Sequence, residues 1–162
     1  MLLNQQQCCS VRLSRLRSFE QLLRCRLRLG RREFNVCLVD DRVIRRLNHA
    51  FRGKARSTDV LSFPWMATSR YSGRRAGSRL RSASPEFRDF LGDVVISVET
   101  ARRNARREGH ATLLEVRWLM LHGVLHLLGY DHETDGGEMT ALELDLRERL
   151  GAAGVHGRLR GR

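Results

Sequence analysis

A run of 13 mostly apolar residues, from Trp118 to Tyr130, limits the folds open to this chain more than any other feature. The run is shorter than the ~20 apolar residues that a membrane-spanning helix needs, and two histidines interrupt it. It therefore indicates a buried helix in one globular domain, and no membrane span is expected. Thr112 to Glu115 reads T-x-x-E, a capping-box signature, and Gly129 suits the left-handed conformation that ends a helix. We expect a helix that begins at Leu113 and ends near Gly129.

Hydrophobic periodicity predicts further helices and strands before and after this run. Apolar residues three and four positions apart, followed by glycine, are typical of amphipathic helices, and short runs rich in Val, Ile and Phe are typical of strands. The first eleven residues, with three consecutive glutamines and a cysteine pair, make a poor strand. Helices are expected at residues 11–29, 43–53, 98–109 and 136–150, and strands at residues 34–39, 58–63 and 91–97.

Charge gives the first indication of function, because 30 basic residues against 18 acidic ones leave a net charge of +12. Such a surface suits a polyanionic partner such as a nucleic acid. Lys54 is the only lysine, and codon bias in a GC-rich genome is an alternative reason for the preference for arginine. That bias does not account for the excess of positive charge. Residues 67–90 are rich in Arg and Ser and are expected to form a long basic loop.

The four cysteines lie in the first quarter of the chain and form neither a disulfide framework nor a C-x-x-C metal motif. A reducing compartment is therefore expected, and the cytoplasm is the preferred location. The arginine-rich N-terminus resembles an organellar transit peptide in composition, so an organelle is the alternative.

Three of the six histidines follow the pattern H-x-x-x-H-x-x-G-x-x-H. His122 and His126 are one helical turn apart and project from one face, while Gly129 lets the chain turn back and present His132 to the same point. Three imidazole ligands with an open fourth position are typical of a catalytic zinc ion, which lowers the pKa of its water to roughly 7. Nickel, copper and iron also accept imidazole. The alternative, three ordinary histidines on an apolar helix, fits this register less well.

The same spacing occurs in metzincin metalloproteases, in which a glutamate general base follows the first histidine. This chain has Gly123 at that position, so a protease would lack its base. Phosphodiester hydrolysis fits better, because it can use a metal hydroxide together with a cation on the phosphate. Glu115 stands two turns before His122 and is interpreted as a capping residue rather than as support for the metal.

These residues resemble a known family of enzymes. Residues 121–132, L-H-G-V-L-H-L-L-G-Y-D-H, are similar to the zinc-site signature of the YbeY family of single-strand endoribonucleases, also called rRNA maturation factors. The motifs F-R-G-K at 51–54, T-D-V-L-S-F-P at 58–64 and L-G-D-V-V-I-S at 91–97 stand in that family's order, and Met139 and Glu143 match its final helix. The resemblance covers residues 36–150.

The resemblance implies an α/β fold, a single compact domain with a mixed, mostly parallel sheet of about four strands flanked by about five helices. The domain is expected to span residues 1–156, with a basic insertion at residues 67–90 and a basic tail at residues 157–162.

The resemblance also assigns roles to individual residues. His122, His126 and His132 would bind one zinc ion per chain, and Arg52 would hold the scissile phosphate through its guanidinium group. Three polar residues in matching motifs are assigned structural support: Asp59, Ser62 and Asp93.

The function that the resemblance implies is zinc-dependent hydrolysis of single-stranded RNA, in 16S rRNA 3′ end maturation and ribosome quality control. The expected partners are single-stranded RNA, rRNA, and the small ribosomal subunit with its proteins, while the oligomeric state is not predicted. Two alternatives stay open: a ribosome-associated RNA-binding assembly factor with a structural metal, and a metzincin-like metalloprotease.

Overall fold

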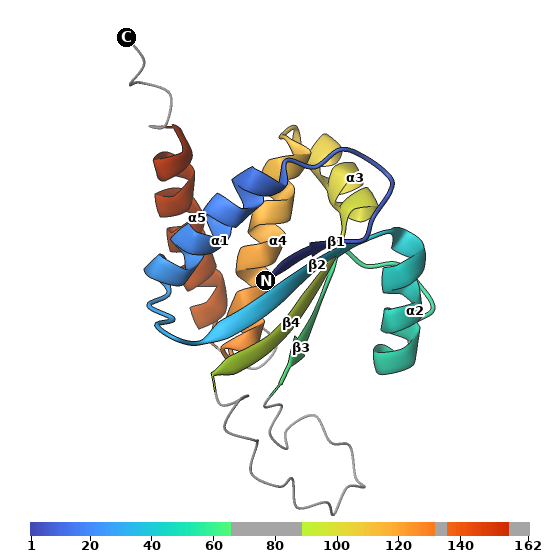
Figure 1. Cartoon of the computed structure of the whole chain (residues 1–162), viewed down its shortest axis with the longest axis horizontal. Helices are drawn as coiled ribbons and strands as arrows, with labels where there is room; N and C mark the ends of the chain where they lie inside the picture. Colours follow the sequence, from blue (N-terminus) through green and yellow to red (C-terminus); the bar gives the residue numbers. More distant parts are fainter. Residues whose placement is uncertain (66–88, 132–135, 156–162) are drawn as a thin grey trace, which may run out of the picture.

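A four-stranded sheet forms the centre of the fold in the computed structural model, which describes residues 1–65, 89–131 and 136–155. The strands are β1 (Leu2–Asn4), β2 (Glu33–Val39), β3 (Val60–Pro64) and β4 (Phe90–Ser97), in the spatial order β1-β2-β4-β3. β1, β2 and β4 are parallel, and β3 is an antiparallel edge strand (Figure 1). The predicted mixed, mostly parallel sheet is confirmed.

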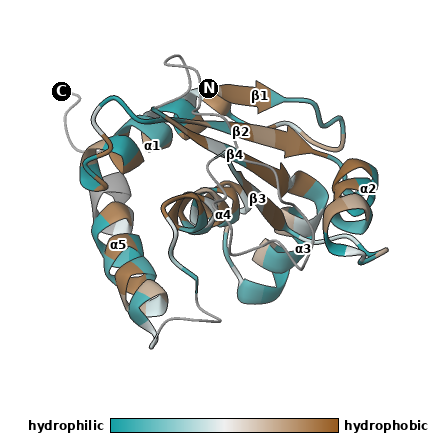
Figure 2. Cartoon of the chain, turned by 90° about the horizontal axis from the view of Figure 1, so that it is seen from below, coloured by the Kyte–Doolittle hydropathy of each residue, from teal (hydrophilic) through white to brown (hydrophobic). Residues whose placement is uncertain are grey.

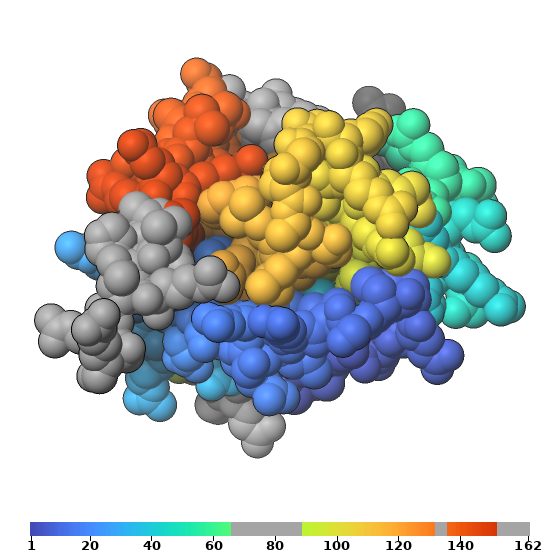
Figure 3. Space-filling model, turned by 90° about the horizontal axis from the view of Figure 1, so that it is seen from above, coloured from blue at the N-terminus to red at the C-terminus, as the bar shows by residue number. Residues whose placement is uncertain are grey.

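Within the described residues, five helices flank this sheet, as predicted. α1 (Leu13–Arg26), α4 (Thr112–Leu127) and α5 (Glu138–Val155) lie on one face, and α2 (Asp41–Arg52) lies on the other (Figure 1). α3 (Val98–Glu108) follows β4 and packs against α4. The space-filling view shows α1, α4 and α3 packed side by side (Figure 3). The chain is therefore one compact α/β domain.

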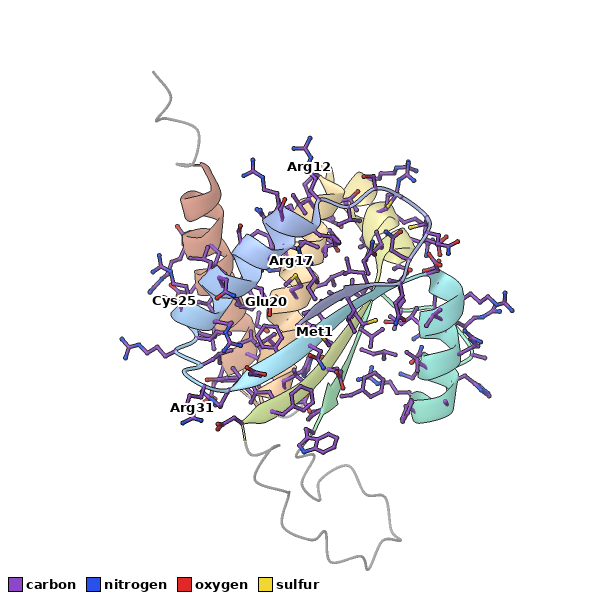
Figure 4. The ribbon with its side chains drawn as sticks, in the orientation of Figure 1. Met1, Arg12, Arg17, Glu20, Cys25 and Arg31 are labelled. Carbon is purple, nitrogen blue, oxygen red and sulfur yellow. The ribbon has the colours of Figure 1, made fainter. Side chains whose placement is uncertain are left out.

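The short strand β1 corrects the expectation that the first eleven residues make a poor strand. Leu2, Leu3 and Asn4 pair in parallel with residues 36–38 of β2. The terminal ammonium group of Met1 donates a 2.7 Å hydrogen bond to the carbonyl of Phe34 and lies 3.4 Å from Oε1 of Glu20 on α1 (Figure 4). Pairing with an available edge of β2, rather than local propensity, creates this strand.

The larger core lies between the sheet and α1, α4 and α5. Alternate residues of β2 and β4 enter this core, among them Val36 and Ile96, because successive side chains of a strand point to opposite faces. α4 contributes more buried residues than α1 does, and Figure 2 shows it nearly end-on among its neighbours. A smaller core joins Ile44 of α2 to the other face of the sheet. No helix in the described part of the chain is long and apolar enough to cross a membrane.

The start of α4 differs from the predicted capping box. The helix begins at Thr112, so Ala111 is the N-cap residue, and no side chain accepts a hydrogen bond there. Glu115 instead pairs with His110, whose Nε2 lies 3.2 Å from Oε2 of the carboxylate. Burial raises the pKa of Glu115 above its ordinary value. The interpretation of Glu115 as a capping residue is therefore wrong.

The end of α4 confirms the prediction for Gly129. This residue has φ of +94°, and its N–H donates to the carbonyl of His126 at 3.0 Å. The next N–H, of Tyr130, donates to the carbonyl of Leu125 at 3.1 Å. Together these two bonds form a Schellman motif, which satisfies carbonyl groups that the helix leaves open. The chain consequently turns sharply just after the second histidine.

Three predicted features fall largely outside the described residues. They are His132, the basic tail at residues 157–162, and the insertion at residues 67–90, of which only the last two residues are described. Of these two, Phe90 begins β4.

Candidate metal centre

His122 and His126 lie on one face of α4, as the spacing predicts. Their Nε2 atoms are 3.1 Å apart, and their rings are 4.7 Å apart between centroids. Leu121 and Leu125, the residues that precede the two histidines, are fully buried. The helix is thus anchored in the core on one side while it presents two imidazole groups on another.

Glu143 on α5 contacts the first of these histidines. Its Oε2 lies 2.9 Å from Nδ1 of His122, and its Oε1 accepts a hydrogen bond from Arg147 at 2.5 Å. Burial alone would raise the pKa of this carboxyl group. The hydrogen bond to His122 and the positive charge of Arg147 outweigh burial and lower the pKa below its ordinary value. Glu143 is therefore ionised at neutral pH.

The ionised state of Glu143 determines which nitrogen of His122 carries the proton. A carboxylate only accepts hydrogen bonds, so the Nδ1–H of His122 donates to Glu143. In a neutral imidazole the other nitrogen, Nε2, then has its lone pair available. This is the nitrogen that faces Nε2 of His126. The contact with α5 thus prepares His122 to act as a metal ligand.

In the sequence, Glu143 stands out only as a match to a family motif, which does not predict this role. The spacing of Glu143 and Arg147, four residues apart on one helix, is a local signal for an ion pair. The contact between Glu143 and His122 depends on how α5 packs against α4, which the sequence pattern does not contain.

Gly123 packs tightly against the sheet. A methyl group built at this position would overlap Cγ1 of Val94 on β4. The carbonyl of Gly123 also accepts a 3.1 Å hydrogen bond from the hydroxyl of Ser62 on β3. The position that carries the general base in metzincins therefore faces the sheet in this chain, and a glutamate side chain would not fit there.

The three residues assigned structural support make contacts within the fold. Besides the bond from Ser62, the carboxylate of Asp59 accepts hydrogen bonds from its neighbours at the start of β3 and from Asn104 on α3. Asp93 accepts a 2.8 Å hydrogen bond from the amide of Asn35. Each of these side chains thus links one element of the fold to another.

Arg52 is the last residue of α2, and its side chain is exposed. α2 packs on the sheet face opposite to α4, so the structure does not place Arg52 beside the histidines (Figure 1). The strand between them is β3, which is one of the two edge strands of the sheet. A ligand that contacts both sites must therefore pass around β3.

The third predicted ligand, His132, lies outside the described residues, so its position stays a prediction. Within residues 1–65, 89–131 and 136–155, no three His, Cys, Asp or Glu side chains converge as a metal site would require. The described part of the centre consists of His122 and His126 with Glu143 behind the first of them.

The chain is similar to proteins of a known family. The family model described as Endoribonuclease YbeY matches residues 3–151. A protein from Nautilia profundicola named Endoribonuclease YbeY is 43% identical over 119 residues, which are 74% of this chain and 73% of that protein. Proteins of the same name from Helicobacter hepaticus and Aquifex aeolicus are 38% and 41% identical, over 86% and 79% of this chain and 78% and 75% of their own length.

A solved structure agrees with these sequence relationships. The solution structure of a protein from Thermotoga maritima superposes with a TM-score of 0.61 and 26% identity, covering 98% of this chain and 94% of that one. The family model, the relatives and the fold all agree, and the chain belongs to the endoribonuclease YbeY family.

Proposed function

We propose that this protein is a zinc-dependent endoribonuclease that cuts single-stranded RNA during the processing of ribosomal RNA. The observation that carries the proposal is the convergence of two imidazole Nε2 atoms, 3.1 Å apart, with the tautomer of one fixed by Glu143. The relatives named Endoribonuclease YbeY support the choice of RNA as the substrate. The net charge of +12 supports it independently, because RNA is a polyanion.

The residues present fit a zinc ion. Two nitrogens bound to one tetrahedral zinc at ~2.0–2.1 Å lie about 3.3 Å from each other, which is close to the 3.1 Å between the Nε2 atoms of His122 and His126. Both residues would hold the ion, with His132 as the third ligand. A zinc ion bound there would act as a Lewis acid that activates water at neutral pH.

Each of the chain's own residues then has a defined task. Glu143 keeps the proton of His122 on Nδ1, and Arg147 keeps Glu143 ionised. Arg52 would bind a phosphate of the RNA through two parallel hydrogen bonds, which a planar guanidinium group allows. The RNA would extend from Arg52 around β3 to the histidines. In the same proposal, the substrate is an rRNA precursor on or near the small ribosomal subunit.

An RNA-binding assembly factor with a structural metal is the second candidate, and the high positive charge favours it equally well. The two candidates differ in what the metal does for the fold. α4 is held by the hydrophobic core, by the bond from Ser62 and by its Schellman motif, and none of these contacts needs a metal. A catalytic metal should therefore be removable without unfolding the protein.

The test compares the protein before and after removal of metal by a chelator. Circular dichroism measures folding, and a labelled single-stranded RNA reports binding and cutting separately. We expect the stripped protein to stay folded and bind the RNA without cutting it, and to cut again when zinc is restored. A protein that unfolds without metal and never cuts would favour the assembly factor. Digestion of a peptide substrate in place of RNA would favour the protease.

A further inference from the structure

Four of the chain's ten aromatic residues (six Phe, two Trp and two Tyr) gather at the end of the sheet where α2 stops. The rings of Phe51 and Phe63 meet edge to face at 5.0 Å, and those of Trp65 and Phe90 meet at 5.9 Å. Trp65 directly follows β3 and its N–H donates to the carbonyl of Leu91, which continues the strand pairing. Phe63 and Trp65 therefore point to the same face. We call these four residues the aromatic row.

Phe51 and Trp65 are the two more exposed residues of the aromatic row. Phe51 is 66% exposed and Trp65 is 48% exposed, whereas their partners Phe63 and Phe90 are half-buried. Each exposed ring is supported by a ring closer to the sheet, which limits the orientations that it can take. A ring that is already oriented loses little conformational entropy when a flat ligand stacks on it.

The segment of the chain that carries Phe51 is basic. The stretch from residue 42 to residue 58 contains no acidic residue. Its basic side chains are all exposed: Arg42, Arg45, Arg46, His49, Arg52, Lys54 and Arg56. Single exposed apolar residues are common on proteins and need no partner. Exposed aromatic rings among cations are a more specific combination, because single-stranded nucleic acids are bound by stacking their bases and neutralising their phosphates.

The aromatic row ends at a hollow of about 630 Å³ that Phe90 helps to line. This volume is within the range of ~300–1,000 Å³ for small-ligand pockets. Its lining includes two cations, Arg24 and Arg31, and three carboxylates, Glu33, Asp89 and Asp93. These carboxylates can accept hydrogen bonds from the N–H groups of a base. The hollow thus has the space and the hydrogen-bond acceptors for a base, whereas its excess of carboxylates does not favour a phosphate.

We propose that the aromatic row stacks unpaired bases of single-stranded RNA, with the exposed rings of Phe51 and Trp65 as its two platforms and the hollow at Phe90 as its end. This inference rests on the proposed function, because it concerns how the same RNA is held. Arg52 follows Phe51 in the chain, so a base on Phe51 places the adjoining phosphate near that guanidinium group. Duplex RNA has its bases stacked on each other, so it is excluded from these platforms.

The test measures binding of a short oligoadenylate in the presence of a chelator, so that no cutting occurs. The same backbone with abasic sugars and a duplex of equal length are the comparison ligands. Phe51→Leu and Trp65→Leu keep an apolar side chain but remove the aromatic face, whereas Phe51→Tyr and Trp65→Phe keep it. Leu144→Ala, which removes a 60% exposed apolar residue from α5, is the matched control.

We expect each leucine variant to bind oligoadenylate about fivefold to a hundredfold more weakly. The aromatic variants and Leu144→Ala should bind like the unchanged protein, and the abasic strand should bind all of them equally. In a Trp118→Phe background, Trp65 is the only tryptophan, and oligoadenylate but not the abasic strand should quench its fluorescence. The proposal would be overturned if the leucine variants bound oligoadenylate as tightly as the unchanged protein does. It would also be overturned if the abasic strand quenched the fluorescence of Trp65 as much as oligoadenylate does.

The two proposals fail in different ways. If the protein cuts RNA but binds oligoadenylate equally with or without the exposed rings, the aromatic row has no role and the endoribonuclease proposal stands. If base-dependent binding and quenching persist but no RNA is ever cut, the aromatic row stands and the endoribonuclease proposal falls.

Discussion

Nδ1 of His122 lies 2.9 Å from Oε2 of Glu143, although 21 positions separate the two residues in the chain. Arg147 holds the other oxygen of the same carboxylate, so the imidazole on α4 is oriented by a pair of charged residues on α5. α5 therefore does more than cover the core, because it fixes the tautomer of a predicted metal ligand. Glu143 is the position at which the site can be weakened without removing a ligand.

Replacing Glu143 with Gln should weaken zinc binding about 10- to 100-fold. The amide keeps the size of the side chain, but it removes the negative charge that makes the Nε2 of His122 a better ligand. Zinc affinity is measured by competition with a chelator, and circular dichroism checks the fold. Glu148→Gln, an exposed position on the same helix, is the control. Equal zinc affinity in the two variants would show that Glu143 does not support the metal.

Replacing Gly123 with Ala should destabilise the protein by about 1–3 kcal/mol through overpacking. Alanine is the better helix former by about 1 kcal/mol, so a loss of stability would identify the overlap with Val94 as its cause. Urea unfolding gives the free energy of each variant. When Val94→Ala is already present, Gly123→Ala should lower the free energy of unfolding by less than it does in the unchanged protein. A stabilised Gly123→Ala protein would contradict the close packing of α4 on β4.

The pKa of Asp41 leads to a prediction about the stability of the fold at low pH. Burial would raise the pKa of Asp41, but hydrogen bonds from Ser97 and Thr100 and the ion pair with Arg103 hold it below the ordinary value of 3.8. The ionised carboxylate therefore stabilises the folded state above pH 3.8, and this contribution is lost as the pH falls through the lower folded pKa.

The Asp41→Asn variant should accordingly be less stable at neutral pH by about 1–2 kcal/mol. The difference from the unchanged protein should persist down to a pH near 3.8 and shrink below it. Asp145→Asn, at a half-exposed position, should change stability by about 0.5 kcal/mol or less. Urea unfolding at several pH values tests this, and a difference that grows as the pH falls would have the wrong sign.

Replacing Arg52 with Lys should lower the rate of RNA cutting about 10- to 100-fold at saturating substrate, because one charged hydrogen bond to phosphate is lost. Zinc content should not change, since Arg52 lies on α2 and not beside the histidines. Arg46→Lys, at another exposed position of α2, is the matched control. If the Arg52→Lys variant cuts RNA at the rate of the unchanged protein, phosphate is not recognised through the planar guanidinium group.

The parts of the fold that sequence predicted are those that depend on local pattern. The apolar run and the histidine spacing identified α4, and Gly129 marked its end, because a helix terminus depends on the conformation of one residue. The capping box failed because Ala111 occupies the cap position and Glu115 has a nearer partner in His110. β1 was missed because its three residues gain their structure from pairing with β2.

The same limit applies to the candidate metal centre. Two of the three predicted ligands share one helix face, which follows from their spacing alone. The role of Glu143 could not be predicted because it arises from the packing of α5 against α4. The close fit of Gly123 against Val94 likewise joins residues that are far apart in sequence. His132 is predicted by the same motif and remains a prediction.

The most direct test measures zinc content and RNA cutting on the same preparations of the unchanged protein, His126→Ala and His49→Ala. His49 is an exposed histidine on α2, so its variant controls for the loss of an imidazole group. We predict about one zinc ion per chain in the unchanged protein and in His49→Ala, with both cutting single-stranded RNA. His126→Ala should lose the metal and the cutting together. A His126→Ala protein that keeps its zinc, or that still cuts RNA, would contradict the assignment of a catalytic metal to these histidines.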